Sequence, residues 1–230
     1  MVDSIAEAIR MNNLGAHALV TGEIAGALDT FLVAFRFAPR HAAIVEAAGP
    51  DRVVVPTPEQ ASALGISFLK KEGTPSKLER ESEGGSFVYE KPLVFNETVP
   101  TSQDGAAVFC AVVVFNIALC FDFMSKHDNV TSIHKTKAMN LYETCIGLFQ
   151  RTSRLVDLSG SMAAACNNKA RICFERGDYE SSNRELHRLS GWIDAADQSP
   201  TRIDLLEEND FNGMLLNLLL LRAPAIAVAA

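Results

Sequence analysis

The sequence lacks the motifs that identify the common classes of enzyme and metal site. Its five histidines show neither an HExxH pair nor the Cys/His spacing of a zinc site. No phosphate-binding glycine loop and no G-x-S-x-G motif occurs. We therefore expect a protein that is not an enzyme, with no catalytic residue, no metal and no cofactor.

Basic residues are also scarce relative to acidic ones. Lys and Arg total 21 against 28 Asp and Glu, which gives a net charge of −7. Nucleic acids and anionic membranes are bound by clustered positive charge, so neither is expected as a partner.

The cysteines lack a pairing pattern. Their number is odd, none forms a C-x-x-C pair, and all lie in apolar stretches. The N-terminal residues carry two acids before the first Arg and have no apolar core, so no secretory signal is expected. We expect buried, reduced thiols in the cytoplasm or another reducing intracellular compartment. The five are Cys110, Cys120, Cys145, Cys166 and Cys173.

Uncharged runs are too short for a membrane span, which needs about 20 residues. Residues 106–121, AAVFCAVVVFNIALCF, lie between Asp104 and Asp122 and predict a helix that is buried on nearly all sides. The C-terminal residues 214–230 are interrupted by Arg222 and Pro224, which would end a helix. We expect no membrane span.

Tryptophan and tyrosine are rare, with one and three copies, whereas Ala and Leu are abundant, and this balance favours helix over sheet. Apolar spacing predicts helices over residues 4–20 and 25–37, joined at Gly22, and over 159–176 and 179–195, joined at Gly177. It also predicts helices over 105–126 and 138–155, separated by the polar stretch 127–135. A last, Leu-rich helix is expected over 202–222.

Residues 49–104 interrupt this pattern. They hold six of the nine prolines and several glycines, which predicts a long irregular connection with one short helix over 58–71. Within it, residues 86–95 read SFVYEKPLVF, an extended apolar stretch that Pro92 keeps out of a central strand. We expect this stretch to pack on the helices as an internal strap, where it would occupy a surface otherwise open to a partner.

The three hairpins share a register. Asn13, Asn116 and Asn168 are each followed two residues later by a small residue, and Gly22 and Gly177 come seven residues after the first and third small residue. The second hairpin keeps this spacing with about eight extra residues, assigned to a longer turn. The other shared positions are Ala27, Phe31 and Ala34 in the first hairpin, Ala138, Tyr142 and Cys145 in the second, and Ser182, Leu186 and Leu189 in the third.

This register, with the closing Pro39 and the Gly177-Asp178-Tyr179 turn, resembles the tetratricopeptide repeat (TPR), a helical hairpin of about 34 residues. The resemblance implies an all-α fold, a single domain over residues 1–230 built as a short solenoid. Its units would span 8–41, 106–152 and 163–196, with 49–104 as a long irregular insertion and 202–222 as a capping helix.

The resemblance also implies a groove lined by the first helix of each unit. An asparagine row there would bracket the backbone of an extended peptide without reading its sequence. The alternative is that Asn13, Asn116 and Asn168 bond inside the fold. The candidate peptide-binding residues are Asn12, Asn13, Asn116, Asn167, Asn168 and Arg171.

The predicted function is that of a non-catalytic adaptor or scaffold that binds a protein or peptide partner. The alternative is a structural subunit of a larger assembly, held through the apolar C-terminal helix. An exposed apolar face over residues 214–221 would favour the subunit, and accessible groove asparagines would favour the adaptor. A third class, an enzyme without a recognisable motif, has no supporting residue.

Overall fold

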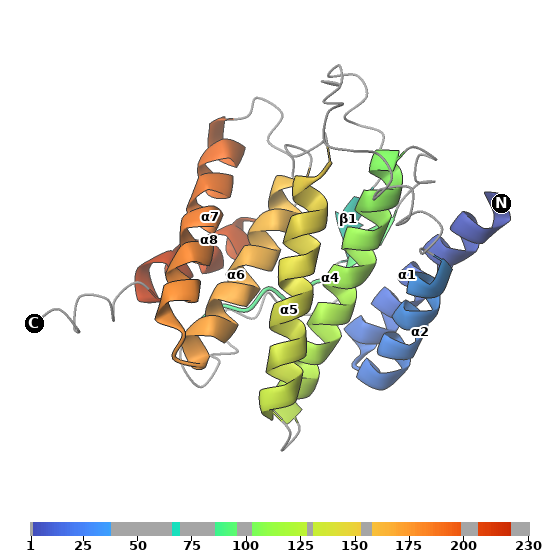
Figure 1. Cartoon of the computed structure of the whole chain (residues 1–230), viewed down its shortest axis with the longest axis horizontal. Coiled ribbons are helices and arrows are strands. Elements are labelled where there is room, and N and C mark those ends of the chain that lie inside the picture. Colours follow the sequence, from blue (N-terminus) through green and yellow to red (C-terminus); the bar gives the residue numbers. More distant parts are fainter. Residues whose placement is uncertain are drawn as a thin grey trace, which may run out of the picture. The chain divides into compact units, whose positions relative to one another are not determined.

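A computed structural model of the chain describes residues 2–37, 66–69, 86–95, 103–127, 131–152, 158–198 and 207–221 (Figure 1). These residues are mostly helical, which confirms the all-α class. The elements are α1 (Val2–Thr21), α2 (Ile24–Phe37), β1 (Ile66–Phe68), β2 (Leu93–Phe95), α4 (Gln103–His127), α5 (Thr131–Gln150), α6 (Ser159–Glu175), α7 (Tyr179–Gln198) and α8 (Glu208–Leu220).

The chain groups into two compact units. Unit 1 comprises Met1–Lys70 and Lys91–Asp157, and unit 2 comprises Lys71–Glu90 and Leu158–Ala230. The dividing point therefore falls inside residues 86–95, after Glu90. Each unit is built around helical hairpins, α1/α2 and α4/α5 in unit 1 and α6/α7 in unit 2.

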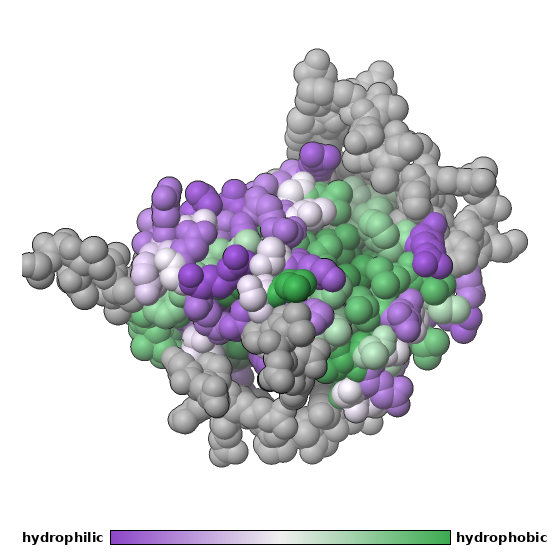
Figure 2. Space-filling view, turned by 60° about the horizontal axis from the view of Figure 1, so that its bottom comes forward, coloured by the Kyte–Doolittle hydropathy of each residue, from purple (hydrophilic) through white to green (hydrophobic). Residues whose placement is uncertain are grey.

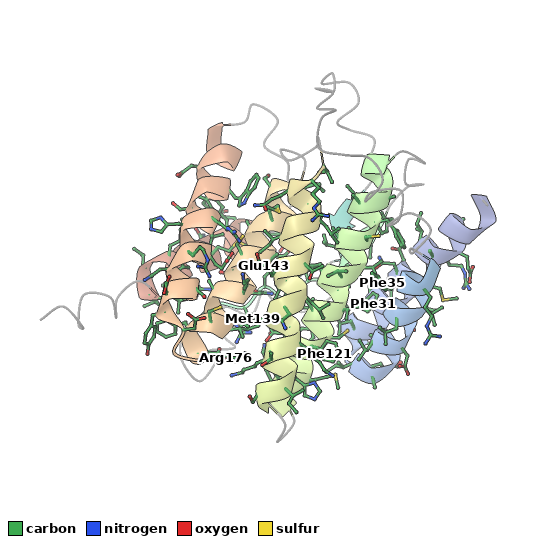
Figure 3. The ribbon with its side chains drawn as sticks, viewed as in Figure 1. Phe31, Phe35, Phe121, Met139, Glu143 and Arg176 are labelled. Carbon is green, nitrogen blue, oxygen red and sulfur yellow. The ribbon has the colours of Figure 1, made fainter. Side chains whose placement is uncertain are left out.

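Residues at the shared register positions are buried in all three hairpins. The small positions, Gly15, Ala118 and Ala170, are buried, and so are the large positions, Phe31, Tyr142 and Leu186. In the first hairpin a Cβ on Gly15 would lie only 2.8 Å from the ring of Phe31, which Figure 3 labels on α2. A small residue at this position thus lets the paired helices approach closely.

The hairpin turns form where the glycines predicted them. α1 ends at Thr21, and Gly22 has a φ of +91°; α6 ends at Glu175, and Gly177 has a φ of +76°. Asp178 then caps α7, since its Oδ1 accepts a hydrogen bond of 3.1 Å from the backbone N–H of Ser181. Hydrogen bonding to the side chain of Ser181, together with this backbone bond, lowers the pKa of the Asp178 carboxyl below its usual value.

We expect Gly177→Ala to lower the free energy of unfolding by about 1–2 kcal/mol, because a side chain is strained at this positive φ. Gly177→Asn is the matched variant, since asparagine tolerates the left-handed conformation better than alanine does. Urea denaturation followed by circular dichroism compares the two. Equal stability of both variants would show that the strain is not what matters at this turn.

The predicted long turn of the second hairpin is wrong. α4 continues to His127 and α5 already begins at Thr131, so most of residues 127–135 belong to helices. The eight extra residues are mainly used to lengthen α4 and α5 beyond the corresponding ends of α1 and α2. Polar residues are compatible with the first turns of α5 because the side chains there, such as Ser132 and Lys137, are exposed.

The connection between the first two hairpins contains a strand pair. β1 and β2 are antiparallel, with Ile66 opposite Phe95 and Ser67 opposite Val94. The short helix predicted over 58–71 is therefore wrong for residues 66–68; residues 58–65 lie outside the described residues. The irregular connection predicted over 49–104 also ends earlier, because α4 begins at Gln103.

The last helix is shorter than predicted. Glu207 has an extended backbone, with a φ of −69° and a ψ of 153°, so α8 begins at Glu208. Residues 202–206 of the predicted helix lie outside the described residues. Glu208 and Asp210 occupy the first turn, where acidic side chains suit the positive end of the helix dipole.

The apolar run in α4 forms a buried core helix, as predicted. Every residue from Ala106 to Cys120 is buried. Among the described helices, α4 alone is long and apolar enough to cross a membrane, over Gly105–Lys126. Most of its apolar stretch, 83%, is buried inside the structure, as in the core helix of a soluble protein. Length and composition alone are weak evidence for a membrane span.

Hydrophobic as well as hydrophilic residues reach the surface (Figure 2). Three leucines of α8 are among the exposed apolar side chains: Leu216, Leu219 and Leu220 are 39%, 73% and 43% exposed. The helix also contributes buried residues, Asp210, Gly213, Met214 and Asn217. α8 thus packs through one side and exposes leucines elsewhere, within the run 214–221 that is apolar nearly all round.

Candidate functional site

Residues 86–95, here called the strap, run alongside asparagines in both units. Unit 1 holds residues 91–95 and unit 2 holds residues 86–90. The asparagines of unit 1 are Asn12 and Asn13 of α1 and Asn116 of α4, here called the unit 1 clamp. Those of unit 2 are Asn167 and Asn168 of α6 and Asn217 of α8, here called the unit 2 clamp.

In the unit 1 clamp, two asparagines each bind both backbone groups of one strap residue. The Oδ1 of Asn116 accepts from the N–H of Leu93 at 2.8 Å, and its Nδ2 donates to the carbonyl of Leu93 at 2.8 Å. Asn13 binds Phe95 in the same way, at 3.0 and 2.7 Å. The strap backbone is therefore held at two alternate residues.

Asn12 links the unit 1 clamp together. Its Nδ2 donates to the carbonyl of Leu93 at 3.1 Å, and its Oδ1 accepts from the Nδ2 of Asn116 at 3.0 Å. Asn12 and Asn116 are fully buried. Because buried amides need partners, this network fixes the orientation of the Asn116 side chain toward the strap.

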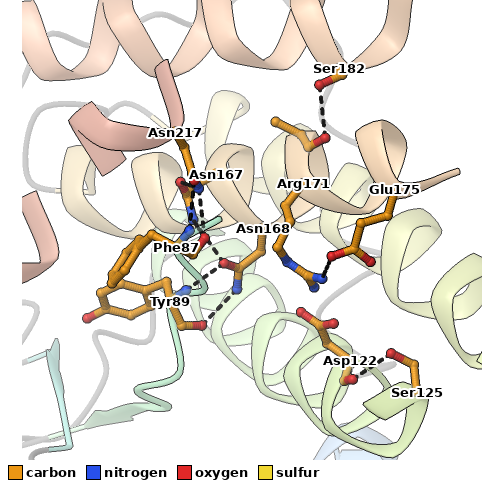
Figure 4. A network of polar contacts seen from close by, with 11 residues as sticks. Phe87, Tyr89, Asp122, Ser125, Asn167, Asn168, Arg171, Glu175, Ser182 and Asn217 are labelled. Carbon is orange, nitrogen blue, oxygen red and sulfur yellow. Dashed lines mark hydrogen bonds and ion pairs between the residues drawn. The ribbon is translucent and has the colours of Figure 1, made fainter. Parts of the chain in front are cut away.

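The unit 2 clamp repeats this arrangement (Figure 4). Asn168 binds the N–H and carbonyl of Tyr89 at 2.8 Å each. Asn217 binds those of Phe87 at 2.8 and 2.7 Å. Asn167 takes the linking role of Asn12, since it donates to the carbonyl of Phe87 at 3.3 Å and accepts from Asn217 at 2.7 Å.

The clamped residues show why asparagine suits this position. A side-chain amide offers one acceptor and one donor in the same arrangement as a peptide group, so each asparagine stands in for a neighbouring strand. Backbone groups of alternate residues point to the same edge of a strand, which matches Phe87 with Tyr89 and Leu93 with Phe95. At the opposite edge, β2 pairs with β1, and the N–H of Leu69 donates to the carbonyl of Pro92 at 2.9 Å.

Three of the four clamped side chains are buried as well. Tyr89 and Leu93 are 0% exposed and Phe95 is 4% exposed, whereas Phe87 is half-buried. The Phe95 ring stacks on Phe109 of α4 with 5.5 Å between centroids. Burial, with the nearby charges of Asp210 and Glu207, raises the pKa of the Tyr89 hydroxyl well above its usual value. The strap therefore contributes large apolar side chains to the core of each unit, as the sequence predicted.

Arg171 takes no part in the asparagine contacts shown here. Its side chain is 3% exposed, and its guanidinium bonds to the Glu175 carboxylate one helical turn away. Nearby in sequence, Lys169 forms a buried ion pair of 2.8 Å with Glu185 of α7. Arg171 therefore does not offer an exposed positive charge to a partner in this structure.

The structure brings the other candidate residues together on the strap. Asn12, Asn13 and Asn116 meet in unit 1, and Asn167 and Asn168 meet in unit 2. All except Asn13, which is half-buried, are fully buried. These asparagines thus form hydrogen bonds inside the fold, which is the alternative that the sequence left open.

Asn217 is the site residue that sequence reasoning missed. The shared register covers only the three hairpins, and the Leu-rich run after them predicts a capping helix. The signal that could have identified it is an asparagine as the sole polar residue within the run from Met214 to Leu221. α8 supplies its asparagine as α4 does in unit 1, so it resembles the first helix of a further unit.

The described residues offer little other chemistry. Among them, no group of three or more His, Cys, Asp or Glu side chains is placed to hold a metal ion. All five cysteines are buried. Burial raises the pKa of Cys110 to about 11, of Cys120 to about 12 and of Cys173 to about 11, so these thiols are protonated at neutral pH and poor nucleophiles.

We expect none of the five thiols to react with 5,5′-dithiobis(2-nitrobenzoate) within minutes in the native protein, because each is buried. After unfolding in urea, all five should react. Absorbance at 412 nm measures both values. Rapid reaction of one or more thiols in the native protein would contradict the described burial.

Comparison of the chain with protein-family models, with curated proteins and with solved structures finds no match.

Proposed function

We propose that the chain is a non-catalytic protein-interaction adaptor, built as a short TPR-like solenoid, that holds extended peptide segments by their backbone. One observation carries the proposal. Four asparagines make eight hydrogen bonds to the backbone N–H and carbonyl groups of an extended segment, and each asparagine binds one residue at both groups.

The TPR-like arrangement is supported by burial. Small and large residues at the shared register positions are buried in each of the three hairpins, as expected for units whose helices pack by the same contacts. In this structure both clamps are occupied by the strap, which is a segment of the same chain. A partner would have to displace the strap or bind elsewhere.

A second candidate is a structural subunit of a larger assembly. It is favoured by the exposed leucines of α8, above all Leu219 at 73%. Accessible asparagines would favour the adaptor, but the strap covers them, and this favours the subunit. The adaptor is favoured instead by the hydrogen bonds that the asparagines make to the backbone of an extended segment. The two candidates place the partner at different residues, and this difference can be measured.

Photo-cross-linking in native extract separates them. A benzoylphenylalanine is placed at Arg10 on α1, one helical turn before Asn13 of the unit 1 clamp, at Leu219 on α8, or at His187 on α7 as the control; all three positions are exposed. Because Arg10 is not part of the strap, it stays beside the clamp when a partner displaces the strap. The adaptor predicts a protein adduct from Arg10 that exceeds the one from His187. An adduct from Leu219 but not Arg10 would support the subunit, and equal yields at all three positions would contradict both.

A further inference from the structure

We propose that each clamp recognises a tripeptide of the form Φ-x-Φ, where Φ is a large apolar residue, and that this motif in another protein is the partner that exchanges with the strap. The inference rests on the proposed adaptor function and names its class of ligand. The strap itself carries the motif twice, as Phe87-Val88-Tyr89 in unit 2 and Leu93-Val94-Phe95 in unit 1.

The backbone contacts set the first part of the rule. Both Φ residues must have an N–H, because Oδ1 of an asparagine accepts it, at 2.8 Å from Leu93 and from Tyr89. Proline is therefore excluded at either Φ. It is tolerated directly before the motif, since Pro92 uses only its carbonyl, which accepts from Leu69.

The side chains set the second part. A shift by one residue would turn the backbone N–H and carbonyl groups to the wrong edge of the strand. A shift by two would move the Φ side chains, three of which are buried, out of their places, so the apolar spacing fixes the register. The first Φ of unit 2, Phe87, lies against Gly213, where a Cβ would come within 2.3 Å of the ring. The first Φ in unit 2 is thus expected to be a flat aromatic residue.

Three residues, Glu90, Lys91 and Pro92, separate the two motifs. Glu90 is exposed, Lys91 is half-buried and Pro92 is buried. Because the clamps contact backbone groups that any extended peptide has, a foreign segment with the same apolar spacing satisfies the same contacts. A tethered strap has an effective concentration on the order of 1 mM, so a foreign peptide competes well only when the strap is weakened.

The test uses the full chain and a labelled peptide. The recipient is the variant Tyr89→Gly with Leu93→Gly, which removes one buried Φ side chain per unit. The probe is fluorescein-labelled SFVYEKPLVF, followed by fluorescence anisotropy. Two modified peptides carry either a backbone N-methyl group at the residues matching Tyr89 and Leu93, or one at the residue matching Val88.

We expect the unmodified peptide to bind the weakened chain at least about tenfold more tightly than the wild type. The peptide methylated at the Tyr89 and Leu93 positions should bind at least about tenfold more weakly than the one methylated at the Val88 position, because it loses two accepted N–H groups. Equal affinities of the two methylated peptides, or no binding to the weakened chain, would overturn the proposal.

Two further measurements keep the result interpretable. If the double variant loses its helical circular dichroism, Phe87→Ala replaces it as the recipient, with the same expectations. Light scattering that shows a dimer dependent on the strap would make the occupant a second copy of this chain and overturn the proposal. Failure of the peptide titration together with an Arg10 adduct in extract would leave the adaptor function standing.

Discussion

Asn168→Ala is expected to lower the free energy of unfolding of unit 2 by about 2–4 kcal/mol. The substitution removes both hydrogen bonds to Tyr89 and leaves a buried backbone N–H and carbonyl without these partners. Asn167 also loses a bond, since its Nδ2 donates to Asn168 at 3.2 Å. Trp192, the only tryptophan, lies in α7, so its fluorescence during urea denaturation reports on this unit.

The matched control is Asn212→Ala in α8. Asn212 is exposed, and alanine is the better helix former by up to about 0.7 kcal/mol, so this variant should be as stable as the wild type or slightly more stable. A stability of Asn168→Ala within about 0.5 kcal/mol of the control would mean that the clamp contributes little.

Gly213→Ala is the second substitution with a large expected effect, a loss of about 1–3 kcal/mol. The added Cβ would lie 2.3 Å from Cδ2 and 2.4 Å from Cγ of Phe87. A rotation of the ring about the Cβ–Cγ bond leaves Cγ in place and does not relieve the clash. Either the side chain turns about the Cα–Cβ bond and leaves its present packing, or the backbone of Phe87 moves and strains its two bonds to Asn217.

Gly191→Ala in α7 makes the same chemical change where nothing lies within 4 Å of the new Cβ, so it should raise stability by up to about 1 kcal/mol. A double-mutant cycle with Phe87→Ala isolates the clash. On the Phe87→Ala background, Gly213→Ala should no longer be destabilising. A loss that is unchanged on that background would assign the effect of Gly213→Ala to a contact other than the Phe87 ring.

Local patterns predicted the hairpins well. Apolar spacing and the two positive-φ glycines marked the helices and the turns at Gly22 and Gly177, because these signals lie within one hairpin. The same register led to Asn13, Asn116 and Asn168. The start of α5 was missed because its first turns are polar and exposed, so that hydrophobic periodicity gives no signal there.

Features that depend on distant residues were harder to predict. β1 consists of three residues whose partner strand lies far along the chain, with Ile66 opposite Phe95. The role of Asn217 depends on Phe87, which is 130 residues away in sequence. The strap was predicted from its unpartnered apolar residues, but the residue-by-residue clamping needs the three-dimensional arrangement of four helices, two in each unit.

The central claim is that asparagine side chains hold the strap by its backbone, and amide hydrogen exchange measures this most directly. In NMR exchange experiments on the native chain, the amides of Phe87, Tyr89, Leu93 and Phe95 should exchange at least about 100-fold more slowly than in an unstructured peptide. In Asn168→Ala, the protection of the Tyr89 amide should fall. Exchange of these four amides at the rate of an unstructured peptide would contradict the claim.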